Sequence, residues 1–422
     1  MKQLKKTTIL LGILLTVNAC NRNNVAVFNE IYGLTEQNNF FKAKELFEAN
    51  KNALSKPCQK YIGAILDNAF NKLETSGKII ANLMQRKNSI PDSLQFKLYE
   101  TKYDNEVKRY NYKEAKHTIL TILNNYKKYL DNEQTDDYEN SLKIWTALEN
   151  TPAQRVDIEK NTTIKMEKDK AGLNTLKMFA NKDSLNFIFD TGANLSATSL
   201  SVAKQLGMEL MPVDIKVGAI TGNKVSAQLA VCDTLTMGNI TFYNVIFLVM
   251  PDETLSFPQV NYQIYGILGF PVIEALKEIR INQNGDFTVP LKESVSTKGS
   301  NMAMNGLTPL IYLNDKHFTF DTGADQTILY QRFYKENQKE IDENYQAEKI
   351  SFGGAGGKKE FDGYTIDYTL NVEGKPVRLE NICLLKEKRK KSEPFYGNIG
   401  QDLIKKFDTM IINFDKMFIR FE

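Results

Sequence analysis

The spacing of apolar residues divides the chain into three parts. From about residue 25 to 150, apolar positions recur every three to four residues, as expected of amphipathic helices. From about residue 155 to the C-terminus, short alternating apolar and polar runs end at Gly, Asn or Asp, which is typical of β-strands joined by turns. A polar stretch at 291–306, with Ser, Gly and Asn, separates two such β regions. The pattern therefore predicts a helical region followed by two β units.

The helical part contains a recurring opening in which an Asn is followed by an aromatic residue and, three positions later, by Ala-Lys. It occurs at Asn39 and again at Asn111, 72 positions apart, within helices predicted at 38–54 and 110–130. Further helices are expected at 76–87 and 140–150. Two intervals of about 36 residues resemble the helix pairs of tetratricopeptide repeats, although the full signature is missing. The sequence thus predicts an α-hairpin array over residues 20–150, which either binds a partner protein or is a plain helical spacer.

The two β regions repeat each other at a fixed offset of 131 residues. An apolar strand ends in Asp-Thr-Gly-Ala at Asp190 and again at Asp321, and a Gly closes an apolar motif 79 positions after each Asp. Four landmarks in one register indicate a duplicated domain. The other landmarks at this offset are Ile281-Asn282 with Ile412-Asn413, and Gly222 with Gly353.

These motifs resemble those of the aspartic proteases, most closely the retroviral-type (retropepsin) members. "DTGADQTIL" at 321–329 is nearly the signature of that group, and "DTGANLSAT" at 190–198 is a looser version. "YGILGFPVIEAL" and "YGNIGQDLIKKF" look like its strand-to-helix element. Retroviral enzymes are homodimers of one-lobe chains, whereas both lobes lie in one chain here, as in pepsin-like enzymes. The resemblance implies an all-β bilobal protease with β-barrel lobes at 155–292 and 303–422, following the α-helical region.

Paired aspartates are the most available catalytic groups. The chain has only two histidines, His117 and His317, so it contains neither an HExxH motif nor a zinc cluster of His ligands. Amide hydrolysis without a metal needs a water between a general base and a general acid. Two carboxyls about 3 Å apart share one proton, because both cannot ionise together. We therefore predict the catalytic pair Asp190 and Asp321, without assigning acid and base, and expect no metal or other cofactor.

The residues after each Asp support the pair. Gly permits a tight turn whose amides face the carboxylate, and the resemblance implies that Thr191 and Thr322 hydrogen-bond across the lobe interface. Ala193 and Ala324 stand where pepsin-like enzymes often carry a hydroxyl that favours the ionised carboxylate. We therefore expect a pH optimum of about 5–6 rather than about 2–3. The predicted supporting residues are Thr191, Gly192, Ala193, Thr322, Gly323 and Ala324.

Two Gly-containing hairpins, 216–229 and 350–364, lie where the family places flaps that close over substrate and exclude water. Ordinary β-hairpins are the alternative, and the second hairpin, with more Gly, is the better flap candidate. The predicted flap residues are Ala219, Ile220, Thr221, Gly222, Gly353, Gly354, Ala355 and Gly356. The predicted cleft-lining residues are Tyr265, Ile267, Tyr396 and Asn398, the last of which replaces an apolar residue of the motif.

The N-terminus has the pattern of an export signal. Three Lys precede an apolar run of about a dozen residues, which is too short to span a bilayer. The "VNAC" ending resembles a bacterial lipobox, which implies a signal peptide at 1–19 and lipidation of Cys20. By resemblance to Gram-negative sorting rules, the absence of Asp after Cys20 implies the outer membrane, facing the periplasm. An ordinary signal peptide is the alternative. Cys58, Cys232 and Cys383 are expected to be isolated buried thiols.

The leading functional hypothesis is a membrane-anchored, exported aspartic endopeptidase. The net charge of +3 gives no reason to expect nucleic acid. The expected partners are a peptide or protein substrate, the membrane and a protein partner for the helical region. A catalytically inactive peptide-binding scaffold that keeps the cleft is one alternative, and a dimer whose lobes pair with another chain is a second. Intact Asp-Thr-Gly motifs argue against the first, and the short linker argues against the second.

Overall fold

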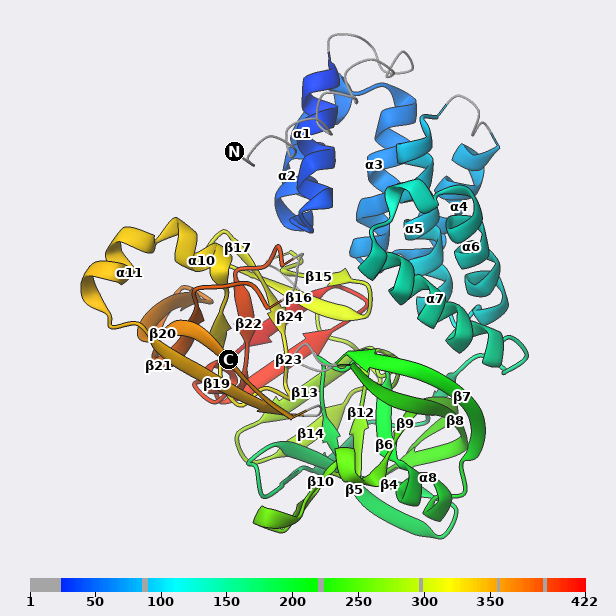
Figure 1. The fold of residues 1–422 in the computed structure, drawn as a ribbon, viewed down its shortest axis with the longest axis vertical. Coiled ribbons are helices and arrows are strands. Elements are labelled where there is room, and N and C mark those ends of the chain that lie inside the picture. Colours follow the sequence, from blue (N-terminus) through cyan, green and yellow to red (C-terminus); the bar gives the residue numbers. More distant parts are fainter. Residues whose placement is uncertain (1–23, 86–89, 219–223, 296–298, 355–356, 390–392) are drawn as a thin grey trace. The chain divides into compact units, whose positions relative to one another are not determined.

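The computed structural model describes residues 24–85, 90–218, 224–295, 299–354, 357–389 and 393–422. The chain divides into two compact units between Glu139 and Asn140. The first unit is α-helical and the second is built mainly of β-sheets (Figure 1). The predicted fold class, a helical region followed by a bilobal all-β region, is confirmed. The predicted signal segment and Cys20 lie outside the described residues.

The helical unit consists of helix hairpins with tight turns. The turns after α1, α3 and α5 each contain a residue with a left-handed backbone: Asn38, Asn71 and Tyr110, with φ of 53°, 58° and 58°. Such a residue ends one helix and lets the next begin within a few positions. None of the helices in the described segments is long and apolar enough to cross a membrane. The helices are α1 (Val25–Glu36), α2 (Phe40–Asn50), α3 (Lys56–Ala69), α4 (Leu73–Met84), α5 (Asp92–Lys108), α6 (Tyr112–Asn125) and α7 (Asn132–Ala147).

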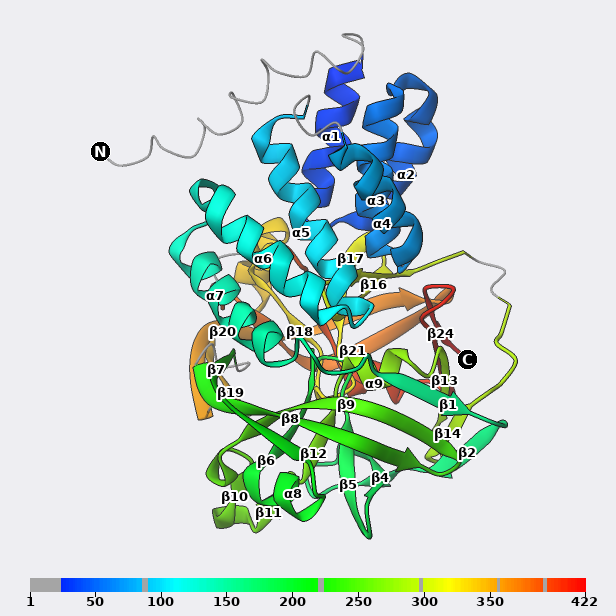
Figure 2. The ribbon, with the colours of Figure 1, turned by 90° about the vertical axis from the view of Figure 1, so that its right-hand side faces the viewer.

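The first lobe of the β unit is a sheet that folds back on itself. Its strands follow the order β1-β9-β6-β12-β5-β4-β8-β7, and β8 also pairs with β9, which closes the sheet. Figure 2 shows the long strands β7, β8 and β9 side by side. The strands are β1 (Arg155–Ile158), β3 (Glu167–Lys168), β4 (Asn174–Ala180), β5 (Asp183–Phe189), β6 (Ser196–Ser199), β7 (Glu209–Gly218), β8 (Lys224–Met237), β9 (Ile240–Met250) and β12 (Gly266–Leu268). The short helices α8 (Leu200–Gln205) and α9 (Phe270–Glu274) and the pair β10 (Ser256–Phe257) and β11 (Tyr262–Gln263) complete it.

The second lobe repeats the central part of this arrangement. Its strands follow the order β15-β16-β17-β22-β18-β21-β20-β19. As β12 lies between β5 and β6, so β22 lies between β17 and β18, parallel to the first and antiparallel to the second. The strands are β15 (Met302–Asn305), β16 (Thr308–Leu313), β17 (Lys316–Phe320), β18 (Ile328–Leu329), β19 (Glu348–Gly354), β20 (Gly357–Val372), β21 (Lys375–Leu385) and β22 (Gly397–Ile399). The helices are α10 (Gln331–Glu336), α11 (Gln338–Asn344) and α12 (Gln401–Ile404).

A third sheet joins the two lobes. It has the order β2-β14-β13-β23-β24, with β2 (Thr162–Lys165), β13 (Glu278–Asn282), β14 (Asp286–Val289), β23 (Thr409–Asn413) and β24 (Phe418–Phe421). In the antiparallel pair of β13 and β23, Arg280 lies opposite Ile411. Because 411 − 280 is 131, a residue here faces its own equivalent in the duplicated sequence. This register is what a local two-fold relation between the lobes requires.

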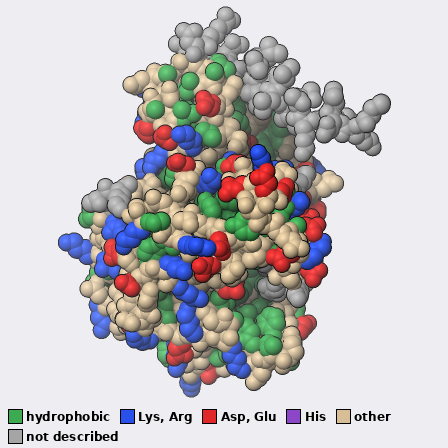
Figure 3. Space-filling model, turned by 90° about the vertical axis from the view of Figure 1, so that its left-hand side faces the viewer, with side chains coloured by type: hydrophobic (Ala, Val, Ile, Leu, Met, Phe, Trp, Pro, Cys, Tyr) green, Lys and Arg blue, Asp and Glu red, His purple; other side chains and the backbone are tan. Residues whose placement is uncertain are grey.

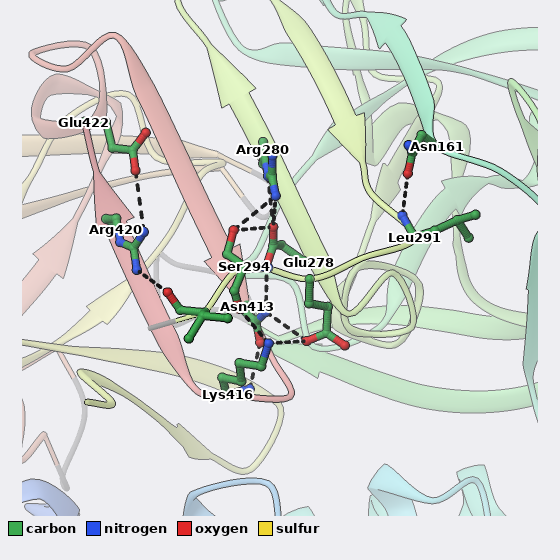
Figure 4. A network of polar contacts seen from close by, with 11 residues as sticks. Asn161, Glu278, Arg280, Leu291, Ser294, Asn413, Lys416, Arg420 and Glu422 are labelled. Atoms are coloured by element: carbon green, nitrogen blue, oxygen red, sulfur yellow. Dashed lines mark hydrogen bonds and ion pairs between the residues drawn. The ribbon is translucent and has the colours of Figure 1, made fainter. Parts of the chain in front are cut away.

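A buried carboxylate anchors the end of this sheet (Figure 4). The side chain of Glu278 is fully buried and accepts hydrogen bonds from Asn413 Nδ2 at 2.8 Å, Ser294 N at 2.6 Å and Arg280 Nε at 2.9 Å. Burial alone would raise the pKa of Glu278, but these hydrogen bonds outweigh it and hold the pKa below its ordinary value. The network therefore ties the segment that leaves the first lobe to strands from both lobes.

The cysteines in the described part of the chain are wholly or partly buried. Cys232 and Cys383 are free thiols, buried and partly buried respectively. Cys58 is buried as well.

The surface carries charges of both signs. On the face drawn in Figure 3, Lys and Arg side chains are interspersed with Asp and Glu, and hydrophobic side chains occur in several places, with a larger patch in the lower part of the view. Among the described residues, the exposed large hydrophobic side chains are Phe179, Val260, Tyr265, Leu291 and Val295.

Candidate active site

Each predicted catalytic aspartate follows the last residue of a central strand. β5 ends at Phe189 and β17 ends at Phe320, and both of these Phe side chains are almost fully buried. The Asp190 N–H donates to the carbonyl of Leu268 at 3.2 Å, and the Asp321 N–H donates to the carbonyl of Ile399 at 3.0 Å. The inserted strands β12 and β22 therefore hold the two Asp backbones in the same way.

The two Asp-Thr-Gly loops are joined by reciprocal hydrogen bonds. The Thr191 hydroxyl donates to the Phe320 carbonyl at 2.9 Å and accepts from the Thr322 N–H at 3.0 Å. The Thr322 hydroxyl donates to the Phe189 carbonyl at 2.8 Å and accepts from the Thr191 N–H at 3.0 Å. Both threonines are only 1% exposed. The structure thus contains the hydrogen bonds across the lobe interface that the family resemblance implies.

The glycine of each loop lies against the aspartate of the other lobe. A methyl group added at Gly192 would lie 2.6 Å from Asp321 Cγ, and one added at Gly323 would lie 2.4 Å from Asp190 Cγ. No side chain fits in that space, so only Gly allows the two loops to approach this closely. The backbone N–H of each Gly also donates to its own Asp: Gly192 to Asp190 Oδ1 at 2.8 Å and Gly323 to Asp321 Oδ1 at 2.9 Å.

The two carboxyl groups form a hydrogen-bonded pair. Burial, the charge of Asp321 and the hydrogen bond with Asp321 together raise the pKa of Asp190 well above its ordinary value. The amides of Gly192 and Ala193 act in the opposite direction but do not outweigh these effects. Such a pair holds one proton over a range of pH, and its two titration steps belong to the pair as a whole.

Polar contacts behind the loops also occur in both lobes. The Gly269 N–H donates to the Ser196 hydroxyl at 3.1 Å, and the Gly400 N–H donates to the Thr327 hydroxyl at 3.2 Å. These hydroxyl residues are equivalent at the offset of 131. Sequence reasoning missed them, although their position six residues after each Asp was a usable signal.

The lobes differ at one position next to the carboxyls. Asn398 in β22 is 5% exposed, and its Nδ2 donates to Asp321 Oδ2 at 3.1 Å. Its Oδ1 accepts from the Thr319 hydroxyl at 2.5 Å, and Thr319 lies directly opposite it in β17. The equivalent residues in the first lobe are Ile267 and Ile188, which are likewise opposite each other. Thr319 was absent from the sequence-based site.

The remaining predicted site residues occupy several environments. The loop residues Ala193 and Ala324 accept hydrogen bonds at their carbonyls from the N–H groups of Phe270 at 2.8 Å and Gln401 at 2.9 Å. Tyr265 is 43% exposed. Tyr396, in contrast, is 7% exposed, and its hydroxyl donates to Glu336 at 2.7 Å.

The two hairpins predicted to be flaps consist of paired strands in the structure. Gly218 pairs with Lys224 at the end of β7 and β8. In the second hairpin, Gly353 and Gly354 pair with residues 358 and 357 of β20. The predicted flap residues Ala219, Ile220, Thr221, Gly222, Ala355 and Gly356 lie outside the described residues.

Comparison with known proteins supports the assignment of the first lobe. A family model described as aspartyl protease matches residues 177–272, from β4 through the Asp190 loop and the first hairpin to α9. The comparison with curated proteins gives no match. This part of the chain is therefore similar to aspartyl protease domains, which supports a protease-like function.

Proposed function

We propose that the β unit is a single-chain, retropepsin-like aspartic endopeptidase whose two lobes form one active site. The observation that carries this proposal is the reciprocal contact of the two Asp-Thr-Gly loops. Their four hydrogen bonds and the packing of each Gly on the opposite Asp bring the two carboxyls together. A second chain is not needed to complete such a pair.

The pair supplies one acid and one base for peptide hydrolysis. The ionised carboxylate takes a proton from water as the water oxygen attacks the peptide carbonyl carbon. The carbonyl oxygen receives the proton of the other carboxyl, which gives a neutral diol intermediate. The C–N bond then breaks as the amide nitrogen receives the proton taken from water. One diol hydroxyl returns its proton to the dyad, which regains its starting single-proton state.

Cleavage of a diverse peptide library by the full chain at pH 3 to 8 tests this proposal. Asp190→Asn and Asp321→Asn should each abolish cleavage, and a statine-type transition-state mimic should inhibit the wild type. Asp325→Asn is the matched control, because it removes the same charge from an exposed position in the same loop. Peptides that bind equally to wild type and both variants without cleavage would instead identify a catalytically inactive binding scaffold.

The pH profile of cleavage should peak at about pH 5–6, because Ala193 and Ala324 supply no hydroxyl to either carboxylate. The raised pKa of Asp190 favours retention of the shared proton as the pH rises above the ordinary pKa of an Asp. A maximum of kcat/KM below about pH 4 would contradict this expectation.

We propose that the protease is exported and anchored to the outer membrane, facing the periplasm, through lipidated Cys20. The N-terminal signal pattern and the lipobox-like "VNAC" support this location. Mass spectrometry of the detergent-extracted protein should find a chain that begins at a diacylglyceryl-modified Cys20. Cys20→Ser should release the protein from the membrane fraction. A mature chain with an unmodified or disulfide-bonded Cys20 would contradict lipid anchoring.

We propose that the helical unit binds a protein partner or a protein substrate. Its helix hairpins are the feature that supports this role. A chain lacking residues 25–131 should cleave short peptides as the full chain does but cleave a folded protein substrate more slowly. Equal cleavage of that protein by both chains would leave the helical unit with a spacing role.

A further inference from the structure

The two catalytic carboxyls have unequal hydrogen-bond partners. Each accepts a backbone N–H at Oδ1, from Gly192 at 2.8 Å in the first lobe and from Gly323 at 2.9 Å in the second, and the Ala193 amide also acts on Asp190. Asp321 also accepts a hydrogen bond at Oδ2, from the Asn398 side-chain amide at 3.1 Å. The first lobe has Ile267 at the equivalent position, and an Ile side chain has no donor. The local two-fold relation is therefore broken beside the reacting groups.

The orientation of the Asn398 amide is fixed by a second contact. Its Oδ1 accepts from the Thr319 hydroxyl, so its NH₂ group faces Asp321. Thr319 is in turn hydrogen-bonded with Tyr330, which is 3% exposed. In this orientation the amide donates to the carboxyl beside it. Donation to a carboxyl oxygen favours the ionised form of that group.

We propose that Asn398 is a positioning residue that places the negative charge of the dyad on Asp321 and the proton on Asp190. This inference rests on the proposed function and deepens it, because it assigns the two roles. Asp321 is then the base that takes the proton from water as the oxygen attacks the carbonyl carbon. Asp190 is the acid that gives its proton to the carbonyl oxygen. When the C–N bond breaks, Asp321 passes its proton to the leaving nitrogen and a diol hydroxyl returns one to Asp190.

The surrounding titratable groups are consistent with this assignment. Asp190 interacts directly with Asp321, and its pKa is raised first by burial and then by the charge of Asp321. Burial raises the pKa of Tyr330 to about 12, so its hydroxyl stays neutral during catalysis. Behind it, the cation of Arg389 lies 3.9 Å from the Tyr330 ring centre and is paired with buried Glu393 at 2.8 Å. Asn398 is thus the neutral group that distinguishes the two carboxyls.

The two limbs of the pH profile of kcat/KM test the assignment. The acidic limb reports formation of the singly ionised dyad, and the alkaline limb reports ionisation of the second carboxyl. If Asp321 carries the first charge, it is ionised in both the singly and the doubly ionised dyad. Asn398→Ile then removes a donor from both of these states and raises only the apparent pKa of the acidic limb, by about one pH unit. If Asp190 carries the first charge, the same variant raises only the alkaline limb. The limb that moves therefore decides between the two assignments.

Further variants separate a proton effect from a packing effect. Asn398→Ala should shift the same limb as Asn398→Ile, and Thr319→Ile/Asn398→Ile reproduces the apolar pair of the first lobe. Ile267→Asn is the reciprocal variant, which offers a donor to Asp190. It should lower the alkaline limb and leave the acidic limb in place. Equal movement of both limbs in all variants, or no movement, would overturn the proposal.

A readout that does not require turnover distinguishes failure of this inference from failure of the proposed function. Carboxyl-¹³C NMR of the aspartate-labelled full chain, with signals assigned by Asp190→Asn and Asp321→Asn, follows both carboxyls directly. Between the two titration steps, Asp321 should have the chemical shift of a carboxylate and Asp190 that of a protonated acid. The reverse order would overturn the inference even in an active protease. The expected order in a protein that cuts no peptide would refute only the function.

Discussion

Replacing Thr191 by Val should loosen the contact between the lobes without changing the size of the side chain. The substitution removes one hydroxyl that serves two buried backbone groups across the interface. The Phe320 carbonyl loses its donor at 2.9 Å, and the Thr322 N–H loses its acceptor at 3.0 Å. The other two bonds of the set, which use the Thr322 hydroxyl, remain.

The expected cost follows from these two groups. A buried polar group without a partner costs about 1–3 kcal/mol. Two such groups should lower the free energy of unfolding by about 2–6 kcal/mol. Because the loop can relax in part, we expect a loss of about 3 kcal/mol. That is a large fraction of the roughly 5–15 kcal/mol that stabilises a typical folded domain. Because misplacement of catalytic groups by about 1 Å can cost 100-fold in rate, kcat/KM should fall by about that factor.

Urea denaturation and hydrogen exchange of peptides covering 185–195 and 317–327 measure the structural effect, and peptide cleavage measures the catalytic effect. Thr198→Val is the matched control. Thr198 is fully buried, and its hydroxyl donates to the Tyr265 carbonyl at 2.7 Å within the first lobe. The control should lose about 1 kcal/mol and keep most of its activity. Equal losses of stability and of kcat/KM in the two variants would refute a special role for the contact between the loops.

Three further substitutions test other parts of the β unit. The raised pKa of Asp190 means that its stabilising effect is complete below the ordinary Asp pKa of about 3.9 and is lost as pH rises through the folded value. Urea midpoints of wild type should therefore fall above pH 4 more steeply than those of Asp190→Asn, and parallel curves would contradict this. Gly323→Ala, which places a carbon 2.4 Å from Asp190 Cγ, should abolish cleavage, so retention of about a tenth of kcat/KM would count against the packing argument. The lowered pKa of Glu278 gives stability that is present above about pH 4.3 and lost as pH falls through the folded value. Glu278→Gln should lower the free energy of unfolding by about 3 kcal/mol at pH 7. Urea titrations from pH 2 to 7 should show a weaker dependence of stability on pH in this variant, and an unchanged pH profile would contradict the expectation.

Much of the β unit was predictable because the duplication supplies an internal comparison. Strand ends, turns and the strand-to-helix elements recur at one offset, and the structure places them in equivalent positions of two sheets. The helical segments were predicted from periodicity alone, and the observed ends of the helices differ from the predicted ends by several residues. The helix predicted at 140–150, for example, belongs to α7, which begins at Asn132. Periodicity identifies a helix more reliably than its first residue, because terminal turns depend on local capping contacts.

Burial separated residues that looked equivalent in sequence. Tyr265 and Tyr396 hold the same position in the two motifs, but the first is 43% exposed and the second 7%. The ring of Tyr396 packs at 4.4 Å from the Arg332 cation, and its hydroxyl binds Glu336. Both of these partners belong to α10, and its equivalent in the first lobe, α8, carries Ser201 and Gln205 at the same two positions. A repeat therefore predicts the backbone of its second copy better than the surroundings of each side chain.

The broken symmetry at Asn398 shows why the roles within the site required the structure. In sequence, Asn398 is one polar residue in an apolar motif, and nothing indicates which group its amide meets. The sheet register places Thr319 opposite it, and this contact turns the NH₂ group toward Asp321. A symmetric pair of carboxyls would share its proton equally, whereas catalysis needs one acid and one base at the same moment. A single donor on one side is sufficient to make that distinction, while the rest of the duplicated scaffold keeps the two groups together.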